Sequence, residues 1–334
     1  MAVLRVGLIG CGGISRAHAA GYRLNRDVAR VVAVCDARRD EAVARAEELG
    51  AEAVYDDYRH LLAARGGDAV DAVDICLPHH LHAEVAIAAT RASKHVLVEK
   101  PIANTLAEAQ AMVEAAQAAG VILQVGHNER FDPQYEEMKR LVAAGEIGDV
   151  LLARTDHNQD VRLPSGHWLR NARQSGGGAL IGSGIHRIDL LRWFLGEVAT
   201  VAQIEVVRPE RFEAEAACLT TLRFQSGAIA EVSTNWVVRR SPWYELMWLS
   251  GTRGSVHNFG GLHLDSEARP ECSGGFARLE LPQRNSFAEE IRHFATCVGD
   301  RRVPLTSGAD ALHTLRVVLA AYRSAAEGGR PVAP

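Results

Sequence analysis

The sequence predicts an α/β protein with an N-terminal Rossmann-type, doubly wound parallel sheet and a C-terminal α+β domain holding a large, open, mostly antiparallel sheet. In the N-terminal part, short apolar runs alternate with Ala-rich helical segments. From about Val150 onward the strand-like runs become longer and are separated by turn sequences. The length of 334 residues suits two domains, at roughly 150 residues for each.

The strands expected in the first half are nearly continuous apolar runs, at Leu4–Ile9, Val31–Cys35, Ala72–Cys76, His95–Val98 and Val121–Val125. Helices are expected between and after them, at Ile14–Asn25, Arg39–Leu49, Leu81–Arg91 and Thr105–Ala119. Because strands covered on both faces are apolar throughout, this alternation favours a parallel sheet between two helical layers. We expect this dinucleotide-binding domain to span residues 1–126.

The strands expected in the second half are Val150–Thr155, Val198–Val207, Ala216–Phe224, Ala228–Trp236 and Tyr244–Leu249. The turn sequences Gln225–Gly227, Arg240–Pro242 and Gly251–Gly254 are typical of antiparallel hairpins. Helices at Gly178–Leu195, Ser286–Val298 and Gly308–Glu327 complete a substrate-binding domain at 127–334, and helix 308–327 could pack back on the first domain. An open sheet would expose apolar surface, which predicts a homodimer or homotetramer formed through it.

Composition narrows the possible functions. Lys and Arg number 37 against 41 Asp and Glu, a net charge of −4 with no basic run, which argues against a nucleic-acid partner. We find neither the ~20 consecutive apolar residues of a membrane span nor a signal peptide, so we expect no membrane partner and a cytoplasmic location. The six cysteines are scattered without a Cys-x-x-Cys pair, which indicates neither disulfides nor zinc.

A nucleotide-binding pattern follows the first strand at Gly10–Ser15. Gly10 permits a tight turn, Gly12 allows the backbone to approach a pyrophosphate, and the following helix offers its N-terminal amides. Asp36, at the end of the second strand, would accept hydrogen bonds from ribose hydroxyls, which favours NAD over NADP. Arg38 and Arg39 could instead pair with a 2′-phosphate. The alternative is a ligand-free turn in which Asp36 only caps a helix.

The sequence Glu99-Lys100-Pro101, taken with the glycine loop and the segment from Gly176 to His186, resembles the Gfo/Idh/MocA family of sugar and polyol dehydrogenases, which includes glucose–fructose oxidoreductase and inositol dehydrogenase. The resemblance implies that Lys100 contacts the reacting hydroxyl and the nicotinamide ribose, and that the Lys100–Pro101 bond is cis. The residues themselves place Lys100 at the carboxyl end of a parallel strand, where such sheets bind ligands. The alternative is a solvated surface lysine.

Two further loops resemble cofactor-binding segments of the family. Leu77–His82 is similar to a Pro-Asn-x-x-His loop that lies along the cofactor, with His79 where Asn is usual. Its three histidines favour cofactor contacts over a metal, because carboxylate and cysteine ligands are absent nearby. Gly126–Phe131 resembles the segment that contributes Asn128 and Glu129 to the nicotinamide and substrate pockets; the alternative is a polar hinge with an Arg130 salt bridge. The predicted cofactor contacts are Gly10, Gly12, Gly13, Ile14, Asp36, Arg38, Leu77, Pro78, His79, His82, Glu99, Lys100 and Asn128.

The resemblance makes His186 the second catalytic residue beside Lys100. The family carries Asp four residues earlier, where this chain has Gly182, so His186 lacks the carboxylate that would orient it. Proton abstraction could then fall on Lys100 alone, on His186 oriented by Asp189, or on a relay between Lys100 and His186. The alternative is a core histidine packed near Trp193 and Phe194.

A polar segment between Asp156 and Arg173 suits a sugar ring, with Trp168 as the stacking residue. Each of its residues could equally be a loop-packing contact. The predicted substrate contacts are Lys100, Asn128, Glu129, Asn158, Trp168, Arg170, His186 and Asp189.

These features predict an NAD-dependent dehydrogenase that transfers hydride from a secondary alcohol of a cyclic polyol, sugar or sugar derivative to nicotinamide, while Lys100 and His186 handle the hydroxyl proton. One alternative is a redox-neutral reaction, NAD-assisted glycoside cleavage or epimerisation. Another is a non-catalytic NAD-binding sensor, which Gly182 makes conceivable.

Overall fold

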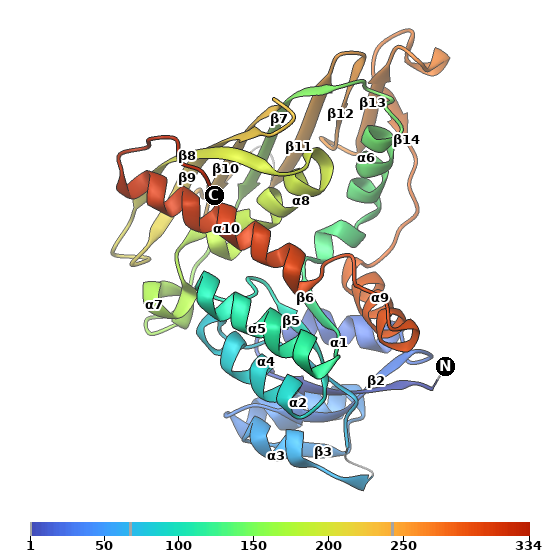
Figure 1. Ribbon diagram of the computed structural model, residues 1–334, viewed down its shortest axis with the longest axis vertical. Helices are drawn as coiled ribbons and strands as arrows, with labels where there is room; N and C mark the ends of the chain where they lie inside the picture. Colours follow the sequence, from blue (N-terminus) through green and yellow to red (C-terminus); the bar gives the residue numbers. More distant parts are fainter. Residues whose placement is uncertain (1, 67–68, 242–243) are drawn as a thin grey trace. The chain divides into compact units, whose positions relative to one another are not determined.

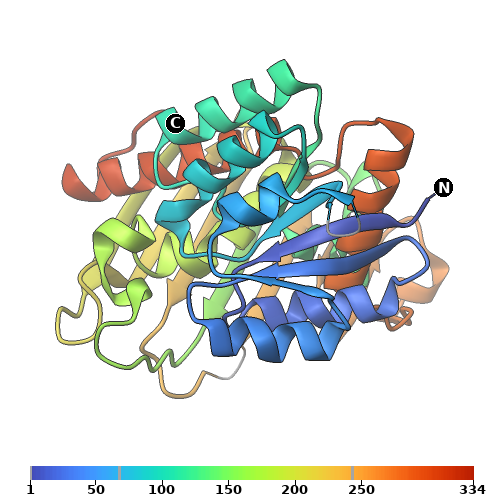
Figure 2. The same ribbon diagram turned by 90° about the horizontal axis from the view of Figure 1, so that it is seen from below.

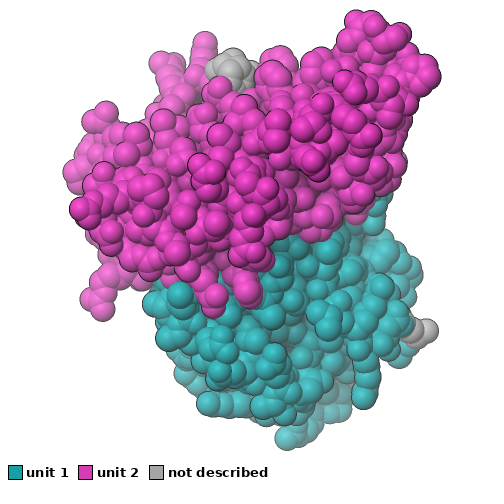
Figure 3. Space-filling view, turned by 45° about the horizontal axis from the view of Figure 1, so that its top comes forward, with its two compact units in different colours: residues 1–131, 284–312 teal, residues 132–283, 313–334 magenta. Residues whose placement is uncertain are grey.

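The computed structural model describes residues 2–66, 69–241 and 244–334. The chain divides into two compact units, unit 1 with residues 1–131 and 284–312 and unit 2 with residues 132–283 and 313–334 (Figure 3).

Unit 1 contains a six-stranded, fully parallel sheet in the order β3-β2-β1-β4-β5-β6. Its strands are β1 (Leu4–Ile9), β2 (Ala29–Cys35), β3 (Ala53–Tyr55), β4 (Ala72–Ile75), β5 (His95–Glu99) and β6 (Leu123–Gly126). This is the strand order of dinucleotide-binding domains, in which ligands bind where the order reverses, between β1 and β4. The predicted Rossmann-type sheet is therefore confirmed.

Helices cover both faces of this sheet (Figure 2). One layer contains α1 (Ser15–Leu24), α2 (Arg39–Leu49) and α9 (Ser286–Asp300), and the other contains α3 (Tyr58–Ala63), α4 (His82–Arg91) and α5 (Leu106–Ala119). Local sequence sets their ends: Thr105 and Glu108 form a capping box at the start of α5, and Gly120 ends it in the left-handed conformation at φ 66°. The two layers bury the sheet, which explains its continuous apolar strands.

Unit 2 contains an eight-stranded sheet in the order β14-β13-β12-β11-β7-β10-β9-β8. Its strands are β7 (Val150–Asn158), β8 (Val198–Val207), β9 (Glu215–Phe224), β10 (Ile229–Asn235), β11 (Glu245–Gly251), β12 (Gly254–His257), β13 (Leu262–Ser266) and β14 (Ala277–Leu279). The paired strands run antiparallel, with β7 and β10 as a parallel exception, so the predicted mostly antiparallel sheet is confirmed. Pro242, part of one expected turn, lies outside the described residues.

The two faces of this sheet differ. Figure 1 shows α6 (Pro133–Ala143), α8 (Ile185–Leu195) and α10 (Gly308–Ala326), whose residues 313–326 belong to unit 2, along one face. The strands present alternate residues to the other face, and several are apolar and exposed, among them Ile204, Leu219, Ile229 and Trp248. The open apolar face expected from the sequence is therefore present.

The observed elements differ from the expected ones in several places. The elements not expected from the sequence are the short strand β3, helices α3 and α6, and the strands β12, β13 and β14 at one end of the second sheet. The strands and α3 have three to six residues, too few to show a period. The 11-residue helix α6 does carry helix signals, an Asp132 cap followed by Pro133 and an apolar face at Tyr135, Met138 and Leu141. The expected domains were 1–126 and 127–334. The two compact units follow the chain differently, because unit 1 also includes residues 284–312, which contain α9 and the start of α10.

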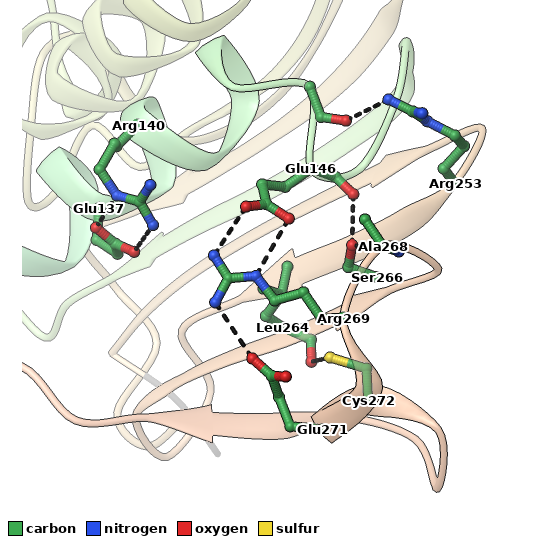
Figure 4. A network of polar contacts seen from close by, with 11 residues as sticks. Glu137, Arg140, Glu146, Arg253, Leu264, Ser266, Ala268, Arg269, Glu271 and Cys272 are labelled. Atoms are coloured by element: carbon green, nitrogen blue, oxygen red, sulfur yellow. Dashed lines mark hydrogen bonds and ion pairs between the residues drawn. The ribbon is translucent and has the colours of Figure 1, made fainter.

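A polar network stabilises the unit 2 sheet near β13, at the end of the sheet where β13 and β14 lie (Figure 4). The Arg269 guanidinium binds the Glu146 carboxylate through two hydrogen bonds, of 3.1 and 2.8 Å, and also contacts Glu271. Ser266 at the end of β13 donates to the carbonyl of Glu146 at 2.7 Å. The connection after α6 is thereby tied to β13, with the bidentate geometry that makes arginine–carboxylate pairs specific.

All six cysteines are free and buried. In the described part of the chain, no helix has both the length and the apolar character needed to cross a membrane.

Candidate active site

The glycine loop after β1 has the geometry of a phosphate cradle. Gly10 adopts φ +95°, and a Cβ there would lie 2.5 Å from the carbonyl oxygen of Cys76. A Cβ at Gly12 or Gly13 would meet nothing within 4 Å, so the loop borders open space. Among the described residues, no side chain caps the start of α1 at Ile14. The amides and positive dipole end of α1 therefore fit a pyrophosphate.

Asp36 lies against this loop. Its Oδ2 accepts a hydrogen bond from the Cys11 amide at 2.7 Å, and its Oδ1 accepts one from the Arg38 amide at 2.8 Å. The Arg38 side chain is 63% exposed and contacts Glu41 as well as Asp36. A carboxylate held at this position fits the ribose hydroxyls of NAD and repels a 2′-phosphate.

Lys100 follows β5 at the carboxyl edge of the same sheet. Its bond to Pro101 is cis, as the resemblance implied. Burial lowers the pKa of the Lys100 amine, and the negative charges of Glu99 and Glu129 oppose that shift. An amine of lowered pKa is suited to accept a proton near neutral pH.

The loop from Leu77 to His82 is fixed by its last histidine. His82 is fully buried, and its ring nitrogens lie 2.8 Å from the carbonyl oxygens of Pro101 and Leu77. His82 thus joins this loop to the segment after Lys100. His79 is also buried, whereas Pro78 is partly exposed.

The segment after β6 holds its polar residues in different ways. Asn128 donates from Nδ2 to Ser286 Oγ at 3.0 Å, and Glu129 is partly exposed. The Arg130 guanidinium is buried, pairs with Asp310 at 2.6 Å and donates to the carbonyl of Leu305. The expected Arg130 salt bridge is therefore present, alongside the polar residues proposed for binding.

In unit 2, the three glycines at 176–178 lead into the segment that carries His186. A Cβ at Gly178 would overlap the carbonyl of Glu215. The buried Glu215 carboxylate accepts the amides of Gly178 at 2.9 Å and Leu180 at 2.8 Å, and the Tyr322 hydroxyl at 2.9 Å. Burial raises the pKa of Glu215 to about 7. Glu215 therefore anchors the start of this segment from β9.

The chain then forms a π-helical turn at Leu180–Gly184, which continues into α8. A Cβ at Gly182 would overlap the six-membered ring of Trp236. Trp236 is buried, its Nε1 donates to Ser183 Oγ at 2.8 Å, and Ser183 donates to Gln159 Oε1 at 2.9 Å. The indole thus occupies the space that a side chain at 182 would need, which explains physically why this chain has glycine there.

His186 is the second residue of α8 and is 9% exposed. Asp189, one turn later, is buried and accepts a hydrogen bond from Thr314 Oγ1 at 3.0 Å. Its carboxylate therefore contacts α10.

The residues predicted to contact a sugar lie on the sheet and on the following segment. Asn158 ends β7 and accepts a hydrogen bond from Asn235, at the end of the adjacent strand β10. Trp168 is partly exposed and stacks on His167 with ring centroids 5.8 Å apart. Arg170 donates to the carbonyl of Glu210 at 2.8 Å. Unit 2 thus carries Asn158, Trp168, Arg170, His186 and Asp189, and unit 1 carries Lys100, Asn128 and Glu129.

Two residues that shape the segment before His186, Glu215 and Trp236, were not predicted from the sequence. The same holds for His18 of α1, whose Nε2 lies 2.9 Å from Oε1 of Glu99. Gly178 and Gly182 were a signal that some group comes close to the backbone. The group that approaches each glycine comes from a segment far along the chain, so Glu215 and Trp236 could not be identified from the local sequence. His18 stands in an Ala-rich helix, where the local sequence pattern gives no signal of its partners.

Known proteins resemble both halves of the chain. Residues 4–127 match the family model described as an oxidoreductase family with an NAD-binding Rossmann fold, and residues 135–257 match the GFO/IDH/MocA C-terminal domain. The chain is 30% identical to scyllo-inositol 2-dehydrogenase (NAD(+)) of Bacillus subtilis over 97% of this chain and 95% of that protein. It is 30% identical to myo-inositol 2-dehydrogenase of Thermotoga maritima over 97% of each.

Among solved structures, levoglucosan dehydrogenase in complex with NADH and L-sorbose superposes with a TM-score of 0.92. The sequence identity is 25%, and the match covers 100% of this chain and 99% of that one.

Proposed function

Since the chain belongs to the GFO/IDH/MocA family of NAD-dependent sugar and polyol oxidoreductases, we propose that it oxidises a secondary hydroxyl of a cyclic polyol or sugar, with Lys100 and His186 handling the hydroxyl proton. The observation that carries this proposal is the place of Lys100. It stands at the carboxyl edge of the Rossmann sheet, next to the segment fixed by His82, and burial lowers the pKa of its amine.

The residues of the chain have separate roles in this reaction. NAD, when bound, supplies the hydride acceptor. The glycine loop and Asp36 hold and orient the dinucleotide, and the Lys100 amine accepts the hydroxyl proton. His186 is the second proton-handling group, and Trp236 replaces a carboxylate at its preceding turn, so we assign the larger share of proton transfer to Lys100.

A cyclic polyol is the substrate class we favour. Two relatives that match nearly the whole chain are named inositol dehydrogenases. Asn158, Trp168 and Arg170 supply amide, aromatic and guanidinium groups of the kind that bind a hydroxylated ring.

The test is to incubate the purified protein with NAD or NADP and a panel of inositols, aldoses and anhydrosugars, following nicotinamide reduction by absorbance. Reduction with one compound class supports the proposal and names the substrate. Product formation without accumulation of reduced cofactor would replace it with the redox-neutral reaction. Binding of NAD without turnover on any compound would replace it with the sensor.

Asp36 gives a prediction for cofactor choice. Asp36→Ala should raise the KM for NAD by about tenfold and narrow the preference for NAD over NADP, because the ribose loses an acceptor and a 2′-phosphate is no longer repelled. Initial rates with both cofactors measure this. Asp40→Ala, at an exposed position in α2, is the control and should keep the wild-type ratio. An unchanged ratio in Asp36→Ala would contradict the role of Asp36.

We further propose that the open face of the unit 2 sheet joins two copies of the chain. Ile204 is 62% exposed, Leu219 44% and Ile229 45%, and they line a cavity of about 630 Å³ on this face. Contiguous exposed apolar surface of this kind typically marks an interface.

The proposed location of the enzyme is the cytoplasm. The six free, buried cysteines suit a reducing compartment of this kind.

Ile204→Glu combined with Leu219→Glu should therefore convert the assembly to monomers, because two carboxylates would be desolvated at the interface. Light scattering coupled to size-exclusion chromatography gives the mass. Val303→Glu, at a position in unit 1 that is 79% exposed, is the matched control and should keep the wild-type mass. A monomeric wild-type protein would refute the interface.

A further inference from the structure

Unit 1 contains a group of buried ionisable side chains, most of which have no part in the chemistry described above. Its centre is His18 of α1, which is fully buried. The Nδ1 atom of His18 lies 2.8 Å from Oδ2 of Asp74 on β4, and its Nε2 atom lies 2.9 Å from Oε1 of Glu99 on β5. An ionised carboxylate only accepts hydrogen bonds, so a ring that bonds to two of them must donate from both nitrogens. His18 is therefore an imidazolium between two carboxylates.

The electrostatics of the three groups agree with this charge state. Burial works against the charged ring, but the Asp74 carboxylate outweighs it and holds the pKa of His18 well above its usual value. Burial likewise works against ionised Glu99, yet the hydrogen bond and the charge of His18 lower the pKa of this carboxyl. A buried ion pair persists when its charges are matched and hydrogen-bonded in this way.

Glu99 connects this cluster to Lys100. While its Oε1 atom binds His18, its Oε2 atom accepts the backbone amide of Lys100 at 3.1 Å. Both carboxylate oxygens are thus held, which fixes the orientation of the group. The charge of Glu99 opposes the burial that lowers the pKa of the Lys100 amine.

Other ionisable groups face the cluster from neighbouring elements. Burial keeps Tyr22 of α1 and Cys76, which follows β4, neutral by raising the pKa of each. His82 of α4 faces Glu99, and Glu129 faces Lys100. Glu290 of α9 is fully buried, and burial raises its pKa well above the usual value, so it is a neutral acid.

We propose that His18 and Glu99 are positioning residues for Lys100: the imidazolium holds the Glu99 carboxylate ionised and oriented, and that carboxylate sets how readily the Lys100 amine gives up and takes up a proton. The proposal rests on the proposed function for the catalytic meaning of Lys100. The electrostatic link from His18 through Glu99 to Lys100 stands on unit 1 alone.

The direction of the effect follows from the charges. Glu99→Gln removes a negative charge, so burial acts on Lys100 with less opposition and its pKa falls. In His18→Gln the carboxylates of Asp74 and Glu99 lose the imidazolium between them. One proton must then bind to these two carboxylates, because two buried negative charges without a cation are unfavourable. The pKa of Lys100 should then fall in the same direction, and the double variant should show no shift beyond that of Glu99→Gln. Glu290→Gln removes no charge and should leave Lys100 unchanged.

The composition of the chain makes this measurable, because it contains only three lysines: Lys94, Lys100 and Lys139. The intact protein is acetylated with trace acetic anhydride across a pH series, and mass spectrometry of the peptides gives the extent of labelling at each lysine. Lys94 and Lys139 serve as internal references. The labelling midpoint of Lys100 should move about one pH unit downward in Glu99→Gln and His18→Gln, and it should stay in place in Glu290→Gln.

The proposal is overturned if Glu99→Gln leaves the Lys100 midpoint where it is in the wild type, if Glu290→Gln moves it as far, or if His18→Gln moves it upward. Should His18→Gln fail to fold by circular dichroism, the pair Glu99→Gln and Glu290→Gln still decides the outcome. The pH profile of kcat/KM should shift to lower pH in Glu99→Gln and His18→Gln and stay in place in Glu290→Gln. Because labelling needs no turnover, a failure of this proposal is distinguishable from a failure of the proposed function.

Discussion

Lys100→Met is expected to lower kcat/KM for the oxidised polyol by about 10²- to 10⁴-fold, the usual range for removing a general acid or base. Methionine keeps an unbranched apolar stem but cannot accept a proton. Steady-state kinetics with the substrate found in the panel measure the loss. The affinity for NAD, measured by fluorescence titration, should change far less.

The matched control is Lys94→Met. This lysine donates to the carbonyl of Val70 at 2.7 Å, at the opposite end of β5, and should retain wild-type kinetics when replaced. Near-wild-type turnover in Lys100→Met would contradict the assignment of proton transfer to Lys100. Turnover that survives in Lys100→Met and is lost in His186→Asn would transfer the role to His186.

Gly182→Asp is expected to destabilise unit 2 by at least about 3 kcal/mol. Its Cβ would overlap the buried ring of Trp236, and overpacking alone typically costs ~1–3 kcal/mol. The carboxylate would add a desolvation cost, because it would lie against the buried ring of Trp236, which itself packs on Phe212. Denaturant unfolding followed by tryptophan fluorescence measures the change.

Gly274→Asp is the control, since a Cβ at this exposed loop position meets no atom within 4 Å, and it should be nearly neutral. Combining Gly182→Asp with Trp236→Ala should recover part of the lost stability, because the smaller side chain vacates the space. A stable Gly182→Asp single variant, or a double variant that is simply the sum of the two losses, would disprove the packing argument.

The pairing of Gly182 with Trp236 also bears on the sensor alternative. The missing carboxylate is a consequence of a bulky, well-packed indole, which Ser183 and Gln159 hold in place. The segment that leads to His186 therefore packs around Trp236 in place of a carboxylate, and its structure remains well defined by these hydrogen bonds. This supports an enzyme whose proton transfer relies mainly on Lys100.

The sequence by itself determined the parallel sheet of unit 1, the glycine loop and the acidic residue after β2. Each of these depends on short segments whose period, turn residues and order along the chain are sufficient, since every β-α-β step is local. The sequence also placed Lys100 at the ligand-binding edge of this sheet, because Lys100 follows β5 and the carboxyl ends of parallel strands lie at one edge. The open face of the second sheet also followed from strand alternation.

Only the tertiary structure decided which groups surround these residues. His18 meets Asp74 and Glu99 because α1 packs against the neighbouring strands β4 and β5. Glu215 on β9 and Trp236 after β10 reach the segment before His186 from distant parts of the chain. Burial then determines the charge of each group, since removing water makes an ionised side chain depend on the partners it finds. Local sequence carries no record of those partners, because they are brought together only when the sheet and its helices pack.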